Sequence, residues 1–102
     1  MNMYQLDFKG GPLIYLFLQV FLYNRAGDFS WRLNNFVITV GNSENSIENQ
    51  ICVADGGNVT DIYEIVNECN PPLQGRYVHV MLKSKGILTL CEVQVYGRQA
   101  GW

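Results

Sequence analysis

Two arginines and an aspartate lie close together in the segment 25–32, which also carries two aromatic side chains. Arg25, Asp28 and Arg32 are the charged residues, and Phe29 and Trp31 are interleaved with them. A guanidinium offers rigidly placed N–H donors and no acceptor, which suits sugar hydroxyls, ring oxygens and carboxylates. An aspartate can hold a guanidinium in place, and an exposed ring offers an apolar face to a methyl group or sugar C–H groups. The segment is therefore either a binding loop or a solvated loop in which one arginine pairs with Asp28.

Residues suited to catalysis or to zinc binding are sparse. The chain has one histidine, His79, and no Cys-x-x-Cys pair, so the ligands for a zinc site are too few. A nucleophile pair of Cys91 and His79 has no third group to orient it. Because His79 lies between Val78 and Val80, we expect an ordinary surface-facing histidine in a strand. No glycine-rich phosphate loop is present, and we expect no enzymatic activity.

Short apolar runs separated by turn residues position these side chains, and no long amphipathic helix is visible. The expected strands cover residues 4–8, 13–23, 35–41, 50–54, 77–82 and 87–96. Residues 61–66 are compatible with a strand or with a single helical turn. The link 83–86 has the length of a hairpin turn between the last two strands. Many short strands at regular spacing predict an all-β fold, an antiparallel sandwich or barrel.

The connections between these strands are polar. Residues 24–31 form a polar and aromatic loop, and residues 42–50, rich in Asn, Ser and Glu, are expected to be an exposed loop. The Asp-Gly-Gly-Asn sequence at 55–58 predicts a tight turn. Asn58 begins an Asn-x-Thr glycosylation sequon, which has a meaning only in a secreted chain.

The length and the charge of the chain argue against a disordered, a nucleic-acid-binding or a membrane-spanning protein. The chain has 102 residues, enough for one domain, and its 48% hydrophobic and 16% charged residues exclude a disordered chain. A net charge of −2 offers no basic surface for nucleic acid. The apolar run 12–23 is shorter than the roughly 20 residues of a membrane-spanning helix and contains Gln19. It also lacks the cationic start and small-residue cleavage site of a signal peptide, so we interpret it as a buried strand.

Several segments together resemble the F-type lectins, or fucolectins, a family of fucose-binding β-sandwich domains. The family's segments are matched in order by residues 4–8, 21–25, 32–36 with 40–42, 75–78 and 88–97. The last of these, Leu-Thr-Leu-Cys-Glu-Val-Gln-Val-Tyr-Gly, is the most specific. The resemblance implies a jelly-roll-like, galactose-binding-domain-like sandwich over residues 1–97, with a short tail at 98–102. It implies a partial domain, because the family's N-terminal part has no counterpart here.

The resemblance also implies roles for the residues of the first loop. Arg25 and Arg32 match the family's two basic sugar-binding positions and would donate hydrogen bonds to fucose. Asp28 would orient an arginine, although it falls one place later than the family's aspartate, and Phe29 or Trp31 would contact the sugar's methyl group. The family's adjacent Cys-Cys pair is absent. Its sugar-binding histidine belongs to the segment upstream, and His79 lies in the wrong part of the domain to replace it.

The family resemblance also implies a bound metal ion, a disulfide and a cellular location. Glu92 matches one ligand of the family's calcium ion, and the remaining ligands are absent from this chain, although calcium needs six to eight oxygens. Cys52 and Cys69 match a disulfide pair, whereas the usual partner of Cys91 lies upstream. The resemblance further implies an extracellular protein that binds fucosylated glycans or glycoproteins. It is compatible with a homo-oligomer and does not fix the oligomeric state.

Two other interpretations remain beside the lectin. One is a structural or protein-interaction sandwich module that has lost sugar binding, which the missing histidine and the altered loop favour. The other is a truncated lectin fragment, which would expose sheet edges and apolar faces and would not melt cooperatively.

Overall fold

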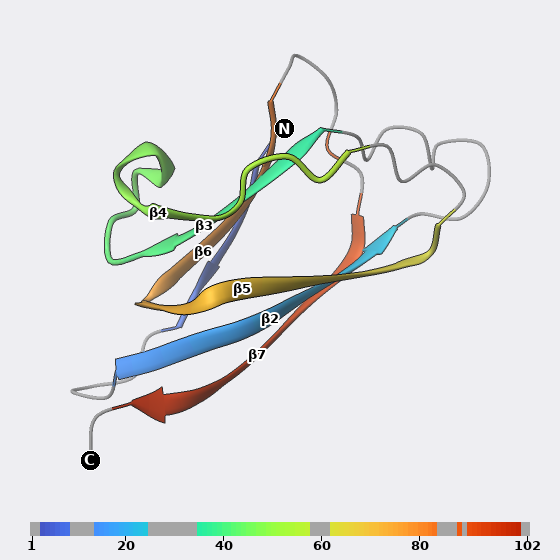
Figure 1. The fold of residues 1–102 in the computed structure, drawn as a ribbon. Helices are drawn as coiled ribbons and strands as arrows, with labels where there is room; N and C mark the ends of the chain where they lie inside the picture. The colour runs from blue at the N-terminus through green and yellow to red at the C-terminus, as the bar shows by residue number, and fades with distance from the viewer. Residues whose placement is uncertain are drawn as a thin grey trace.

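Two antiparallel sheets lie face to face in the computed structural model, which describes residues 3–8, 14–24, 35–57, 62–83, 88 and 90–100. Only the backbone is described for 14–18, 99 and 100. The described residues form strands β1 (Met3–Asp7), β2 (Ile14–Asn24), β3 (Phe36–Gly41), β4 (Gln50–Val53), β5 (Glu64–Gly75), β6 (Tyr77–Leu82) and β7 (Leu90–Ala100), with one 3-10 turn, η2 (Ser46–Glu48). Within them, one sheet has the order β1-β6-β3-β4 and the other the order β5-β2-β7 (Figure 1). The prediction of an antiparallel β-sandwich is confirmed.

Alternating apolar residues of the two sheets meet in the core. Val20 and Leu22 of β2 and Ile38 and Val40 of β3 are fully buried, as the period of two in a strand requires. The other buried apolar members of this core are Phe36, Cys69, Leu73, Val78 and Val80. The described part of the apolar run at 12–23 is therefore a strand, β2, with Val20 and Leu22 in the core. Within the described residues, no helix has the length and apolar character needed to cross a bilayer.

The strand boundaries agree closely with the predicted ones, with two extensions. Residues 64–66 of the ambiguous segment 61–66 belong to β5, so they form a strand, and β5 continues through the two prolines at 71 and 72 to Gly75. Residue 61 lies outside the described residues. β7 runs to Ala100 and pairs there with Ile14, so residues 98–100, which we had assigned to a tail, belong to a strand.

The predicted hairpin between the last two strands is wrong. β6 pairs with β1 and β3, whereas β7 pairs with β2 in the other sheet. A short connection permits a hairpin, but its length does not determine which strand pairs with which. Here β7 pairs instead with β2, in a long register that runs from Ile14 to Asn24.

His79 is buried, so the predicted surface-facing histidine is wrong as well. It lies on the face of β6 opposite to Val78 and Val80, in register with Thr39 and Gln5, and is 0% exposed. This outer face is covered by the loop that carries η2. Ser46, which is also buried, donates to Met81 Sδ at 3.4 Å. The loop 42–49 is thus only partly exposed and acts as a third layer over the sheet.

Candidate functional site

The residues predicted to bind sugar lie outside the described residues. Arg25, Asp28, Phe29, Trp31 and Arg32 all belong to the segment 25–34, which connects β2 to β3. The structure describes the residues on both sides of this segment. β2 belongs to the three-stranded sheet and β3 to the four-stranded sheet, so the segment connects the two sheets at one end of the sandwich.

Backbone hydrogen bonds hold both ends of the segment. Asn24, which is fully buried, donates its N–H to the carbonyl of Tyr63 at 2.7 Å. Asn35 has a positive φ of 51°, donates to Gly57 at 2.9 Å and accepts from the N–H of Lys83 at 3.0 Å. A segment whose two ends are hydrogen-bonded to other parts of the fold can position binding residues.

The predicted turn at 55–58 contributes to this anchor. Asp55 accepts from the N–H of Gly57 at 2.9 Å, and Gly57 has a φ of +69°, a conformation that glycine adopts without strain. The N–H of Gly57 lowers the pKa of the Asp55 carboxyl, and Lys83 at 3.4 Å lowers it further. The sequence predicted this turn for residues 55–58, of which the structure describes 55–57. It gave no signal that the turn and Lys83 lie beside the end of the segment 25–34.

Exposed aromatic residues lie beside the start of the segment. The rings of Tyr23 and Tyr63 have their centroids 5.8 Å apart, and Tyr63 is 57% exposed. Burial raises the pKa of Tyr23, and the carboxylate of Glu64 raises it further. Tyr23 lies in the matched segment 21–25, and Tyr63 lies in no recognisable motif, but no sequence feature assigns either ring to a site.

Glu92, the predicted calcium ligand, is exposed on β7 and accepts a hydrogen bond from Gln94 Nε2 at 2.7 Å. The Gln94 carboxamide oxygen in turn accepts from the hydroxyls of Tyr23, at 3.3 Å, and Tyr96, at 3.0 Å. Among the described residues no group of three or more His, Cys, Asp or Glu side chains could hold a metal ion. Glu92 is therefore without two further acidic ligands in this part of the chain.

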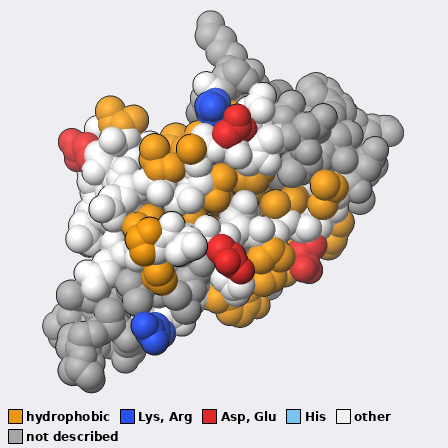
Figure 2. Space-filling model, in the orientation of Figure 1, with side chains coloured by type: hydrophobic (Ala, Val, Ile, Leu, Met, Phe, Trp, Pro, Cys, Tyr) orange, Lys and Arg blue, Asp and Glu red, His pale blue; other side chains and the backbone are white. Residues whose placement is uncertain are grey.

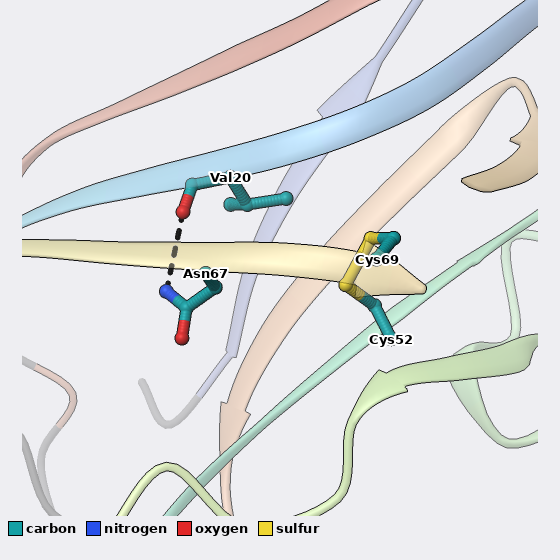
Figure 3. The surroundings of a disulfide bond; sticks show 4 residues. All are labelled: Val20, Cys52, Asn67 and Cys69. Carbon is teal, nitrogen blue, oxygen red and sulfur yellow. Dashed lines mark hydrogen bonds between the residues drawn. A yellow bond between two sulfur atoms is a disulfide. The ribbon is translucent and has the colours of Figure 1, made fainter. Parts of the chain in front are cut away.

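The disulfide that the family resemblance implied, between Cys52 and Cys69, is present in the structure. Cys52 of β4 and Cys69 of β5 form a disulfide, next to the point where Asn67 Nδ2 donates to the carbonyl of Val20 at 3.2 Å (Figure 3). Cys91 is a free, exposed thiol at the start of β7. The sequon asparagine, Asn58, lies outside the described residues.

The architecture of the described residues defines an antiparallel β-sandwich module, with the segment 25–34 connecting its two sheets. Fucolectin-1 of Anguilla japonica is 34% identical over 84 residues, which cover 80% of this chain and 47% of that protein. A fucolectin from the serum of Morone saxatilis, the striped bass, superposes with a TM-score of 0.76 and 31% identity over 95% of this chain and 32% of that one. A mutant of the lectin binding domain of lectinolysin, solved as a complex with Lewis b, has a TM-score of 0.69 and 29% identity, covering 96% and 65%.

In sequence and in fold the chain is similar to the F-type lectins, as the matched segments predicted. It spans about half the length of the curated relative that it matches. No family model matches the chain.

Proposed function

We propose that this chain is a carbohydrate-recognition module that binds fucosylated glycans and catalyses no reaction. The observation that carries the proposal is its similarity to fucolectins in both sequence and fold. A related lectin domain was solved in complex with Lewis b, which supports a glycan as the class of ligand. The anchored ends of the segment 25–34, which carries the two matched arginines, support the location of the site.

In this proposal the two arginines provide the polar contacts to the sugar. Arg25 and Arg32 donate to the ring oxygen and hydroxyls of fucose, because a guanidinium places several donors in a rigid plane. Asp28 orients one of the two guanidinium groups by a charge-assisted pair. Phe29 or Trp31 provides the apolar contact to the methyl group of fucose.

We further propose that the protein acts outside the cell. The disulfide between Cys52 and Cys69 supports this, since such bonds persist mainly in oxidising compartments. The calcium ion that the family resemblance implies stays a prediction.

The experiment is a calorimetric titration of the oxidised chain with L-fucose in calcium-containing buffer, followed by a glycan array. We expect fucose binding that Arg25→Ala weakens by about tenfold or more, as the loss of a charge-assisted contact predicts, while the melting temperature stays unchanged. Arg98→Ala, which removes an exposed arginine of β7, is the matched control and should bind as the wild type does. A cooperatively folded chain that binds no fucose would contradict the proposal and favour a structural or protein-interaction module.

A further inference from the structure

A second place for a ligand lies on the outer face of the three-stranded sheet, about 16 Å along β2 from Asn24, at roughly 3.3 Å per residue. It is an open hollow of about 460 Å³. Side chains from all three strands contribute to its lining, namely Gln19, Glu68, Asn70, Pro72 and Tyr96, and it extends to Gly97. Gln19 is in register with Glu68 on one side and with Tyr96 on the other, opposite to the core residue Val20. The hollow therefore opens to solvent and not into the core.

An irregularity in the strand pairing creates this hollow. From Glu68 to Leu73 the chain of β5 advances five positions, while its partner β2 advances only two, from Gln19 back to Phe17. The extra residues of β5 cannot stay in the ladder, so they form a raised wall beside β2. Cys69 in this wall is bonded to Cys52 of β4, which fixes the wall to the opposite sheet.

Tyr96 stands on the other side of the hollow with its ring held in position. Its hydroxyl donates to Gln94 Oε1 at 3.0 Å, and its ring meets the Phe21 ring edge-on at 4.9 Å between centroids. The residue is nevertheless 50% exposed. A fixed and exposed aromatic ring can bind an apolar C–H surface with little loss of side-chain entropy.

The polar groups of the hollow suit a neutral ligand with several hydroxyls. Gln19 and Asn70 are amides, which both donate and accept, and Glu68 is an acceptor. No lysine or arginine is among the lining residues. On the same outer face, Glu64 and Glu92 lie beside Tyr23, two rows of the sheet away from the hollow, and the exposed Arg98 follows Gly97 on the other side. Figure 2 shows acidic groups among hydrophobic ones, together with a basic group, in the lower half of the view, where β2, β5 and β7 lie. Among the described lining residues only Glu68 is charged, and its carboxylate disfavours an anionic ligand in the hollow.

We propose that this hollow is a second carbohydrate subsite, which takes a neutral pyranose unit with its C–H face on Tyr96 and its hydroxyls on Gln19, Glu68 and Asn70. The volume lies in the range of small-molecule sites, roughly 300–1,000 Å³. The proposal goes beyond the fucose site of the segment 25–34 and shares no residue with it. It therefore stands or fails independently of that site.

The test is a titration of the ¹⁵N-labelled chain with methyl β-D-galactopyranoside and methyl β-D-glucopyranoside, followed by amide chemical shifts. We expect saturable shifts at residues 68–70 and 96–97 that persist in the Arg25→Ala variant. Tyr96→Ala should weaken the binding about tenfold, as the loss of one aromatic contact predicts. Tyr63→Ala, which removes another exposed tyrosine outside the hollow, should leave it unchanged.

A second pair of variants keeps the test valid if Tyr96→Ala fails to fold. Glu68→Gln should weaken binding, and Glu64→Gln, four residues away on the same face of β5, should not. The proposal is overturned if neither glycoside shifts these amides, or if Arg25→Ala abolishes the shifts. It is also overturned if N-acetyl-lysine methylamide or N-acetylneuraminic acid shifts these amides at lower concentration than the two glycosides do.

Discussion

Cys52 of β4 and Cys69 of β5 join the two sheets of the sandwich covalently. Cys69 is buried at 4% exposure, next to the irregular part of β5 that forms the wall of the outer hollow. The disulfide therefore acts on the packing of the sheets and on one candidate ligand site at the same time.

Removal of this disulfide should lower the free energy of unfolding. The two cysteines are 17 residues apart, and the entropy of closing a loop of that size corresponds to about 3 kcal/mol. We expect the double variant Cys52→Ala, Cys69→Ala to show this loss in urea denaturation. Cys91→Ser is the control and should unfold at the wild-type midpoint, because Cys91 is exposed and unpaired. Equal midpoints for the double variant and the wild type would contradict the prediction.

Gly75 is required by the close approach of two strands at the turn from β5 to β6. A Cβ atom on Gly75 would lie 2.7 Å from the backbone of Gly41, which cannot move without distorting β3. We expect Gly75→Ala to cost about 2 kcal/mol in chemical denaturation, as overpacking does. Gly57→Asn is the control for a glycine without crowding: nothing lies within 4 Å of its Cβ position, and only the strain of the positive φ, which asparagine adopts more readily than most residues, adds a smaller cost. A variant Gly75→Ala as stable as Gly57→Asn would contradict this assignment.

Much of the fold could be predicted from the sequence, because most strands have a local pattern. The residues at 36, 38 and 40 alternate and are all buried as expected. The segments that carried the family resemblance are also structural partners. The segments 4–8 and 75–78 meet where β1 pairs with β6, at Leu6 with Val78 and Asp7 with Tyr77. Beside these pairs, Arg76 Nε and Nη2 donate to the two carboxylate oxygens of Asp7 at 2.6 and 3.0 Å. In this ion pair Asp7 raises the pKa of Arg76.

The errors concern properties that depend on distant parts of the chain. The prediction of a hairpin failed because β7 pairs with ten residues of β2, and no local signal at 83–86 indicates this competing pairing. The irregular wall of β5 was also not visible, since the prolines at 71 and 72 indicate extended backbone but not its register with β2. For the proposed sugar-binding loop, the sequence selects residue types, and the structure adds the anchors at Asn24 and Asn35.

The core should respond to a change at Ile38, which is fully buried between the two sheets. Truncation of such a side chain removes apolar burial and leaves a cavity, so Ile38→Ala should cost about 2–5 kcal/mol. The control is Ile47→Ala in η2, because Ile47 is 83% exposed and should change stability by less than about 0.5 kcal/mol. Both values come from equilibrium urea unfolding followed by tryptophan fluorescence. Similar losses in the two variants would contradict the assignment of Ile38 to the core.

His79 should make the stability of the protein depend on pH. The loop 42–49 buries its ring, which stacks on Tyr77 with centroids 6.2 Å apart, while Nε2 lies 3.0 Å from Gln5 Oε1. Burial lowers the pKa of His79 below 6.5, and the backbone of Glu44 opposes this shift. The unfolded chain therefore binds a proton at a higher pH than the folded chain does.

The sign of the effect follows from this difference in proton binding. Stability is fully present above the unfolded-state pKa of about 6.5 and falls as the pH decreases toward the lower, folded-state pKa. We expect the urea midpoint to decrease from pH 7 to pH 5, with a contribution of up to one proton from His79. His79→Gln, which keeps a polar group beside Gln5 and does not titrate, should remove that contribution. Parallel pH profiles for the wild type and His79→Gln would mean that the folded protein protonates His79 as readily as the unfolded chain.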